Sequence, residues 1–448
     1  MSLRKVAVAI LSWNGRHHLE VCLPSLATQH DPGVEWDVWV LDNGSRDGTV
    51  DWLRENHPDV KVIASPVNLG FCGGVNRLVE AAEDADAVAL LNNDTRAQPG
   101  WLAALVDGLA SAPDDVAAVS GLIVDWQGDR LDFGRGIMTF DGHAFQKDFR
   151  QPLDTVEIPA AGDELLFACG GNMLIRRQSF LDAGGFDNAY FAYLEDVDLG
   201  WRLWSGGERV IFSPDAVVHH RSMATSALLG NDHRGFLFER NAFLTAYKNY
   251  DAELWPAMMP AVQLTLGHRT QTLLVQNNPG GEQLTFDPYA GLIADTAPVV
   301  IDEPASSSAA APAGAAPAVQ NPSLWRKFRD HGAREMARRG VRKAARKILP
   351  GFVFDAPNHA PTVADGRTVA QFRALTWLYG HLDPADAERR RIQARRTVPD
   401  REIFARFPLY LIPTYPGDRR LFGSEAFTRW LPAEPRLERA RLDEIMAE

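Results

Sequence analysis

The chain has 448 residues, of which 46% are hydrophobic and 23% are charged. This composition is that of an ordinary globular protein, and the length allows two or three domains with a sizeable core. The formal net charge of −12 argues against a general nucleic-acid-binding surface, because a surface that binds a polyanion has to be basic.

Short apolar runs alternate with helix-like segments through the first half of the chain. The apolar runs at residues 6–11, 37–42, 60–65 and 87–91 predict strands, and residues 18–28, 49–56, 74–82 and 100–110 predict helices. Strands that are apolar throughout are buried on both faces, as in a parallel sheet between layers of helices. We therefore predict an α/β domain with a mostly parallel sheet.

Each predicted strand ends in small or polar residues. These ends are SWNG at residues 12–15, DNGS at 42–45, NLGF at 68–71 and NND at 92–94. One such end is ordinary turn chemistry. In parallel sheets, however, ligands bind beyond the carboxyl ends of the strands. Four polar ends along that edge indicate a binding site.

No segment has the pattern of a secretion signal or a membrane span. The apolar stretch after the basic start is short and lacks a cleavage-like site, so we interpret it as the first strand. No apolar run approaches the roughly 18 residues that a bilayer requires. The cysteines, Cys22, Cys72 and Cys169, are widely spaced, which favours a reducing compartment and argues against disulfides and a zinc site. We expect a cytoplasmic protein, either free or peripheral on the inner face of the cell membrane.

The second half of the chain has a different pattern. Residues 254–276 are helix-like but contain two prolines, and residues 305–319 form an Ala/Pro/Ser-rich stretch that predicts a flexible linker. Residues 322–350 carry ten Lys and Arg against two acids, with apolar residues between them. This basic segment fits an amphipathic helix on an anionic membrane and equally a solvated helix that packs on the rest of the protein.

Seven segments of the first 250 residues together resemble one enzyme family. They are VAVAILSWNG, VLDNGSRDGT, NLGFCGGVN, LLNNDT, CGGNMLIRRQSF, GGFDNAYFAYLEDVDLGWRLWSGG and VVHHRS. Their order and spacing resemble those of the inverting glycosyltransferases of family two, close in pattern to bacterial rhamnosyl- and galactofuranosyl-transferase-like members. Each segment alone is a weak signal, but the set is highly specific.

The resemblance implies a GT-A fold over residues 1–250, which is Rossmann-like with a mostly parallel mixed sheet and helices on both faces. We expect a mainly helical C-terminal extension after it. This extension divides into a helical part at 251–300, a flexible linker at 301–322 and a C-terminal region at 323–448 that contains the basic amphipathic helix. Because few contacts cross a flexible linker, we predict that a chain ending near residue 300 folds and still binds nucleotide.

Asp94, at the end of a predicted strand, suits a divalent cation. Such a cation, held by hard oxygen ligands, would balance the charge that grows on a donor's diphosphate as the sugar leaves. The resemblance makes residues 92–94 the counterpart of the family's DXD-type motif, although Asn92 is an amide and a poor metal ligand. It makes His219, next to His220, the second metal ligand, and this pair suits Mn²⁺ as well as Mg²⁺. Purely structural histidines are the alternative.

The other strand ends are candidates for binding a nucleotide-sugar donor. Asp42 would accept a hydrogen bond from the base, which selects uracil or thymine because N3 of cytosine carries no proton. Glycines would let the backbone approach the nucleotide closely. Simple turns and a helix start are the plainer alternatives. The expected donor-binding residues are Ser12, Asn14, Asp42, Asn43, Asn68, Gly70, Gly74, Asn92 and Asn93.

The segment LEDVDLGWRLW contains the expected general base. An inverting transfer needs one base within hydrogen-bond reach of the acceptor hydroxyl. The resemblance assigns this role to Asp196, with Glu195 orienting or tuning it. The plainer interpretation is a helix start whose acids complement the helix dipole. The residues expected at the acceptor pocket are Gly170, Gly171, Asn172 and Trp201.

These features together predict a metal-dependent, inverting glycosyltransferase of the hexosyltransferase type. It would move a sugar from a UDP- or dTDP-sugar to a hydroxyl of a glycan or lipid-linked acceptor in cell-surface polysaccharide synthesis. A sugar nucleotidyltransferase would need a glycine-rich basic loop near the N-terminus, and SWNGRHH is not one. A processive synthase would need membrane spans and a QxxRW motif, and AFTRW at residues 426–430 lacks the glutamine. A non-catalytic nucleotide-sugar- or glycan-binding protein would not need Asp94, Asp196 and His219 together.

Overall fold

The computed structural model describes residues 3–221, 231–276 and 366–446. Their contacts place these residues in one compact unit, Met1–Thr296 together with Val363–Glu448. The predicted linker at residues 301–322 and the basic segment at residues 322–350 lie outside the described residues.

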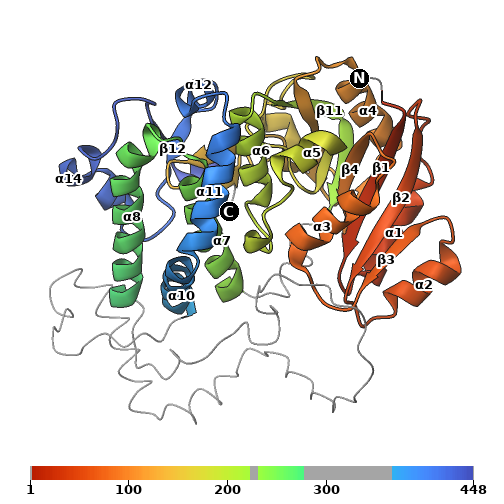
Figure 1. Ribbon diagram of the computed structural model, residues 1–448, viewed down its shortest axis with the longest axis horizontal. Coiled ribbons are helices and arrows are strands. Elements are labelled where there is room, and N and C mark those ends of the chain that lie inside the picture. The colour runs from red at the N-terminus through yellow and green to blue at the C-terminus, as the bar shows by residue number, and fades with distance from the viewer. Residues whose placement is uncertain (1–2, 222–230, 277–365, 447–448) are drawn as a thin grey trace, which may run out of the picture. The chain divides into compact units, whose positions relative to one another are not determined.

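In the described part of the chain, nine strands form the main sheet (Figure 1). Their order is β3-β2-β1-β4-β10-β6-β11-β5, with β7 paired to β6; Figure 1 labels β3, β2, β1 and β4 at one end of this order. The strands are β1 (Lys5–Ser12), β2 (Glu35–Asn43), β3 (Lys61–Ser65), β4 (Ala87–Asn92), β5 (Thr95–Ala97), β6 (Val116–Asp125), β7 (Leu131–Phe133), β10 (Asn172–Arg176) and β11 (Arg209–His220).

The first half of this sheet is parallel, as expected. β1 pairs in parallel with β2 and β4, β2 pairs so with β3, and β6 with β11. β5, β7 and β10 run antiparallel to their neighbours. The apolar runs at residues 6–10 and 87–91 are buried. The interpretation of these runs as central strands of a mixed, mostly parallel sheet is confirmed.

Helices follow the parallel strands. The four expected from the sequence are confirmed as α1 (Arg16–Leu26), α2 (Thr49–Asn56), α3 (Gly70–Ala81) and α4 (Trp101–Ser111), and α5 (Arg177–Ala183) and α6 (Glu195–Ser205) come after them. α3 packs on β1 and β2, whereas α4 packs on β6 and β11. α3 begins at Gly70 rather than at Gly74, so the helix starts within the polar strand end NLGF.

Four further strands of the described chain form a second sheet in the order β13-β12-β8-β9. β8 (Gly136–Thr139) and β9 (Ala144–Gln146) belong to the N-terminal half, whereas β12 (Leu409–Leu411) and β13 (Glu438–Arg439) belong to the end of the chain. β12 pairs in parallel with β8. The end of the chain therefore completes a sheet that the N-terminal half begins.

The remaining described residues are mainly helical, which confirms the expected C-terminal extension. The helices are α7 (Asn231–Asn249), α8 (Leu254–Gln276), α10 (Gly366–Gly380), α11 (Leu382–Arg395), α12 (Asp400–Arg406), α13 (Asp418–Phe422), α14 (Glu425–Thr428) and α15 (Leu442–Ile445). α10 and α11 pack on α7, and α12 packs on α6, so these three helices lie beside the middle of the chain (Figure 1). No described helix is both long and apolar enough to cross a membrane.

Buried polar contacts join the C-terminal segment, residues 366–446, to the N-terminal half. Nε1 of Trp201 in α6 donates to Oδ1 of Asp400 at 2.8 Å. The guanidinium of Arg269 in α8 bonds Asp141 at 2.9 Å and Asp418 at 3.0 Å, and all three of these side chains are buried. Removing Asp400 leaves the Trp201 N–H buried without its acceptor, which costs about 1–3 kcal/mol. A chain ending near residue 300, expected above to fold by itself, would lose the bonds to Asp400 and Asp418.

Candidate active site

Asp42, at the carboxyl end of β2, keeps one acceptor atom free of protein donors. Its side chain is 2% exposed. Oδ2 accepts the backbone N–H of Ser45 at 3.1 Å, whereas Oδ1 is buried and has no hydrogen-bond partner among the described residues. A buried acceptor without a donor is unfavourable. Oδ1 is therefore suited to a donor group that a ligand supplies.

The loop after β1 forms a rim beside this carboxylate. The Asn93 side-chain amide donates to Ser12 Oγ at 3.1 Å. Asn14 has a φ of 49°, in the left-handed region that asparagine tolerates. Its Oδ1 accepts the Arg46 backbone N–H at 2.8 Å, and its own N–H donates to Ser45 Oγ at 2.8 Å. These bonds tie the loops after β1 and β2 together.

Asn43 and Asn68 fix the loop that leads into α3. Asn43 Nδ2 donates to Asn68 Oδ1 at 2.9 Å, and Asn43 Oδ1 accepts the Leu69 N–H at 2.8 Å. Asn68 Oδ1 also accepts the Gly70 N–H at 2.8 Å. Both amides, expected to bind the donor, use their polar atoms here to hold backbone at the ligand-binding edge.

Close packing explains the two expected glycines of α3. Gly70 has a φ of 73°, and a Cβ there would lie 2.5 Å from the ring of Phe191. A Cβ on Gly74 would lie 2.3 Å from Leu11 Cδ1. Glycine is thus needed at both positions for α3 to sit against β1 and the loop before α6.

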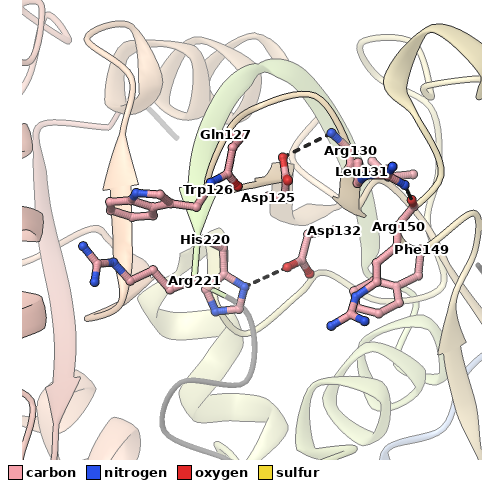
Figure 2. Close-up of a pocket in the computed structure, with 10 residues that line it drawn as sticks. All are labelled: Asp125, Trp126, Gln127, Arg130, Leu131, Asp132, Phe149, Arg150, His220 and Arg221. Carbon is pink, nitrogen blue, oxygen red and sulfur yellow. Dashed lines mark hydrogen bonds and ion pairs between the residues drawn. The ribbon is translucent and has the colours of Figure 1, made fainter. Parts of the chain in front are cut away.

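Asp94 pairs with a histidine at the end of β11. The carboxylate is 6% exposed, and its Oδ1 lies 3.2 Å from His220 Nε2. The other ring nitrogen, Nδ1, lies 3.0 Å from Asp132 Oδ2, as Figure 2 shows. Burial lowers the pKa of His220, but the hydrogen bonds to Asp132 and Asp94 outweigh it and raise this pKa to about 10. Burial raises the pKa of Asp94, and the bond from His220 brings it below its usual value.

The expected pair of Asp94 and His219 is not the pair that the structure brings together. Consecutive residues of a strand point to opposite faces of the sheet. Nε2 of His219 lies 3.3 Å from Nε2 of Gln98, and its Cε1 would be 2.7 Å from a Cβ on Gly128. His220 therefore takes the place beside Asp94 that was expected for His219.

The donor set of Asp94 and His220 fits a divalent cation. A carboxylate bonded to Nδ1 of a histidine orients Nε2 toward a metal, and Asp132 lies in that position. The described part of the chain contains no group of three or more His, Cys, Asp or Glu that could hold a metal ion. Two protein ligands fit a cation whose other positions are filled by water and by substrate phosphate oxygens, as Mg²⁺ prefers.

Glu195 and Asp196 occupy the first turn of α6. Asp196 accepts the backbone N–H groups of Gly170 at 3.1 Å and Val197 at 2.9 Å. Oε2 of Glu195 is buried without a partner in the described chain. Burial and then the charge of Asp196 raise the pKa of Glu195 well above its usual range, and burial also raises the pKa of Asp196. Asp196 is thus the better site for the negative charge, and Glu195 for a proton.

A strained loop leads into α6. Phe191, Tyr193 and Leu194 have φ values of 63°, 72° and 65°, which residues other than glycine rarely adopt. From α7, the side-chain amide of Asn241 donates to the carbonyl of Ala192 at 2.8 Å and to that of Tyr193 at 2.7 Å. Strain of this kind persists only where the surroundings fix it, and it clusters at active sites. The loop before Glu195 has both properties.

Gly170 and Gly171 connect the two parts of the site. The Gly170 N–H donates to Asp196 Oδ2 at 3.1 Å, and the Gly171 carbonyl accepts the Asn92 N–H at 3.2 Å. A Cβ on Gly171 would lie 2.7 Å from Asn92 Nδ2, so only glycine lets these segments approach. Asp196 and the last residue of β4, two positions before Asp94, are therefore bonded to adjacent residues of one chain segment.

Asn172 and Trp201, expected at the acceptor pocket, are fully buried. Asn172 Nδ2 donates to the carbonyls of Leu122 at 3.1 Å and Ala216 at 3.0 Å, which joins β10 to β6 and β11. Trp201 is covered by the C-terminal segment and bonded to Asp400. Both side chains are 0% exposed, so the expected acceptor role is replaced by a structural one at both positions.

Three functional candidates were not anticipated from the sequence. His220 was noted only as the neighbour of the expected ligand, and the alternation of side chains along β11 is the signal that separates the two histidines. Asp132 and Asn241 gave no local signal, since Asp132 lies 88 positions from His220 and Asn241 lies 48 positions from Tyr193.

Sequence comparison relates this chain to glycosyltransferases. A family model described as Glycosyl transferase family 2 matches residues 7–183. The N-acetylglucosaminyl-diphospho-decaprenol L-rhamnosyltransferase of Mycobacterium tuberculosis is 32% identical over 238 residues, which are 49% of this chain and 76% of that protein. The glycosyltransferase AglE of Haloferax volcanii is 22% identical over 234 residues, 51% of this chain and 71% of that protein.

Solved structures with partial similarity were also found. GalNAc-T7 with UDP, GalNAc and Mn²⁺ has a TM-score of 0.47 and 16% identity, covering 58% of this chain and 51% of that one. The mannosyltransferase PcManGT of Pyrobaculum calidifontis, in complex with GDP-Man and Mn²⁺, has a TM-score of 0.40 and 18% identity, covering 64% and 77% of the two chains.

Proposed function

The chain belongs to glycosyl transferase family 2, and on that premise we propose that it is a metal-dependent, inverting enzyme that transfers a sugar from a UDP- or dTDP-sugar to a hydroxyl group. The observation that carries this proposal is the link through Gly170 and Gly171, which bonds Asp196 on one side and Asn92, two residues before Asp94, on the other. A donor diphosphate held at Asp94 would then lie beside a base for the acceptor.

Asp42 would recognise the donor base. Its unpartnered Oδ1 would accept the N3–H of uracil or thymine, and a carboxylate cannot donate to the bare N3 of cytosine. The tied loops after β1 and β2, with Ser12 and Asn14, would flank the base and the ribose. The buried position of Asp42 gives this selection its strength, because water competes little there.

Asp94 and His220 would hold Mn²⁺ or Mg²⁺, with Asp132 orienting the imidazole. When bound, the cation would balance the negative charge that develops on the diphosphate as the sugar leaves. Asp132 would keep the proton on Nδ1 of His220 and so leave the Nε2 lone pair for the metal.

Asp196 would take the proton of the acceptor hydroxyl. Its two backbone N–H bonds hold the carboxylate in one orientation, and burial raises its pKa, which makes it a stronger base than an ordinary aspartate. Glu195 would carry a proton, which keeps a second charge away from Asp196. Because the base and the diphosphate seat are different groups, a single displacement with inversion at the anomeric carbon suits the site.

For the acceptor, we propose a glycan or lipid-linked hydroxyl in cell-surface polysaccharide synthesis. The support is the relative of Mycobacterium tuberculosis, whose name specifies a diphospho-decaprenol acceptor. The reaction would take place on the cytoplasmic side of the membrane, with the basic segment at residues 322–350 touching anionic lipid.

Two assays test the proposal on the full chain. The first incubates the protein with UDP- and dTDP-sugars and Mn²⁺ and measures the release of nucleoside diphosphate. A nucleotidyltransferase would release diphosphate from a nucleoside triphosphate instead, and a binding protein would release neither product. The second assay measures thermal protection by UDP or dTDP with and without Mn²⁺.

Metal assignment is decided by three variants in the second assay. Asp94→Ala and His220→Ala should abolish the Mn²⁺-dependent part of the protection. His219→Ala is the matched control and should keep it, because that ring lies on the other face of β11. Unchanged metal dependence in both Asp94→Ala and His220→Ala would refute the metal site.

A further inference from the structure

A cavity of about 730 Å³ lies beside the Asp94–His220 pair. It is formed at the end of β6, around β7, at residues 149–150 and at the end of β11 (Figure 2). The residues that matter here are Trp126, Arg130, Phe149, Arg150, His220 and Arg221. Pockets of about 300–1,000 Å³ are the size that small ligands occupy.

The two carboxylates of this cavity are already satisfied by the protein. Oδ1 of Asp125 accepts the backbone N–H groups of Gly128 at 2.8 Å, Asp129 at 3.0 Å and Arg130 at 3.1 Å. Asp132 is bonded to Nδ1 of His220. Among the ion pairs of the described residues, Asp132 pairs with His220 and not with Arg130, Arg150 or Arg221, so the positive charge of these arginines stays available.

Arg150 and Arg221 have no carboxylate partner within the described ranges, and each lies against an aromatic ring. The Arg221 guanidinium is 4.2 Å from the centroid of Trp126, and the Arg150 guanidinium is 5.1 Å from that of Phe149. Arg130 donates to the Arg150 carbonyl at 2.8 Å. A guanidinium that rests on a ring keeps its N–H groups directed away from the ring and free for an anion.

The backbone at the cavity is also held in an unusual conformation. Asp148 and Arg150 have φ values of 60° and 62°. The Arg150 N–H donates to the Leu131 carbonyl at 2.7 Å, and with the bond from Arg130 this fixes the loop at the cavity. Residues other than glycine are held at such positive φ values only where the surrounding structure fixes them, and this happens most often at functional sites.

The cavity adjoins the reaction centre on the side away from the nucleotide. His220 is one of its walls, and the backbone N–H of Arg221 donates to the Asp94 carbonyl at 3.1 Å. Asp42, the proposed base-binding group, lies at the end of β2, whereas the cavity is built on β6, β7 and β11. A molecule in the cavity would therefore approach the donor from the opposite side to the nucleotide, where an acceptor has to lie.

We propose that this cavity binds the phosphate or diphosphate ester group of the acceptor, an inference that rests on the proposed glycosyltransferase function. Arg150 and Arg221 pair with the phosphate oxygens, because guanidinium groups match phosphate geometry with two N–H donors each. Leu131 and the part of the Phe149 ring that Arg150 leaves uncovered line the same cavity and meet the adjoining sugar ring or the first carbons of the lipid. The cation at Asp94 serves the donor diphosphate, and the arginines serve the acceptor phosphate.

The test titrates the full chain, saturated with UDP or dTDP and Mg²⁺, with geranyl diphosphate as a soluble isoprenyl diphosphate, using calorimetry. Geraniol and inorganic phosphate are the matched probes that lack the charge and the chain, respectively. Arg150→Gln, Arg221→Gln and the double variant are compared with Arg54→Gln, whose side chain is exposed on α2 and lies 4.0 Å from Asp51. The single variants keep the test valid if the double variant fails to fold.

We expect geranyl diphosphate to bind more tightly than both matched probes, and its affinity to fall by about tenfold for each arginine removed, as for hydrogen bonds to a charged group. Arg54→Gln should match the wild type. Equal binding of inorganic phosphate would overturn the inference in favour of a free-anion site. An equal loss of nucleotide affinity in the arginine variants would overturn it in favour of a donor site. Absence of geranyl diphosphate binding while nucleotide still binds refutes this inference alone, whereas absence of nucleotide binding refutes the proposed function.

Discussion

The carboxyl edge of the main sheet and the C-terminal segment support the same site in different ways. At the edge, the groups that would meet the substrates lie where strands end, since Asp42 is among the last residues of β2 and Asp94 follows β4. In the C-terminal segment, Asp400 instead supports α6 by bonding Trp201 across 199 positions of the chain. Asp42 and Asp94 can be recognised in local patterns of sequence because they lie where apolar strands end, whereas the bond between Trp201 and Asp400 leaves no such pattern.

Deleting the C-terminal segment is expected to have the largest effect, and it tests whether this segment is needed to hold the scaffold. A chain that ends near residue 300 would lose the partners of Trp201 and Arg269 and the strand β12 that completes the second sheet. We expect this truncated protein to be insoluble or to unfold without a cooperative transition. Size-exclusion chromatography and thermal unfolding followed by circular dichroism would measure the effect.

The matched variant for this deletion is Asp400→Ala in the full chain, which removes the bonds of this carboxylate to Trp201, to Arg396 and to the Asp251 N–H and keeps the rest of the segment. It should fold and lose about 1–3 kcal/mol of unfolding free energy. A soluble truncated protein that binds UDP as tightly as the full chain would show that the segment is dispensable, and the contrast between the two regions would fail.

Asp196→Asn is the largest test at the edge itself. The substitution is nearly isosteric, and the amide oxygen can still accept one of the two backbone N–H bonds, but the amide cannot take a proton. Transfer should fall by about 10² to 10⁴, while the affinity for nucleoside diphosphate and the metal dependence stay unchanged. Steady-state kinetics and calorimetry on the same preparation would separate these effects.

Glu195→Gln is the control for that experiment, and it should reduce transfer less, since Glu195 would act through Asp196. The anomeric configuration of the product, read by NMR, tests the same mechanism independently. Undiminished transfer in Asp196→Asn, or a product of retained configuration, would contradict the assignment of the base.

Features that depend on local sequence were predicted correctly, whereas features that depend on distant parts of the chain were not. The four parallel strands, their helices and the mainly helical C-terminal extension were predicted, because apolar runs and their spacing are local. A histidine near Asp94 was predicted from the sequence, but His219 was predicted in place of His220. The sequence does not show which face of β11 meets that carboxylate. The burial of Asn172 and Trp201 was missed because it depends on partners that only the fold brings near.

His143 offers a test at the junction between the two regions. Its ring lies 3.2 Å from Asp141 and 3.2 Å from Glu239 of α7, and Asp141 is also bonded to Arg269. Burial lowers the pKa of His143, but the charges of Asp141 and Glu239 outweigh it and raise this pKa to about 9. The folded pKa thus exceeds the unfolded value of about 6.5, so the stability is complete below pH 6.5 and is lost as the pH rises through about 9.

We expect this loss to be on the order of 2–3 kcal/mol, since one pKa unit corresponds to about 1.4 kcal/mol. Urea unfolding at pH 6 and at pH 9.5 would measure it, with His143→Gln as the control that lacks the titrating group. The difference in unfolding free energy between wild type and variant should shrink over that pH range. A constant difference would mean that His143 is not charged in the folded protein.

The smallest effect is expected for a substitution of Asp42, at the carboxyl edge of the main sheet. Asp42→Asn keeps an oxygen that can accept the Ser45 N–H, but it replaces the unpartnered Oδ1 with an amide that donates. Such an amide can pair with N3 of cytosine and opposes the N3–H of uracil. UDP affinity should therefore fall by about tenfold, as for one hydrogen bond to a charged group, while CDP affinity stays the same or rises.

Calorimetry with UDP and CDP measures this change. The two nucleotides share the ribose and the diphosphate, so a difference between them reports on the base, and Asp51→Asn on the exposed side of α2 is the control. An equal change for both nucleotides would place the base elsewhere, because only a group that touches the base can distinguish the two.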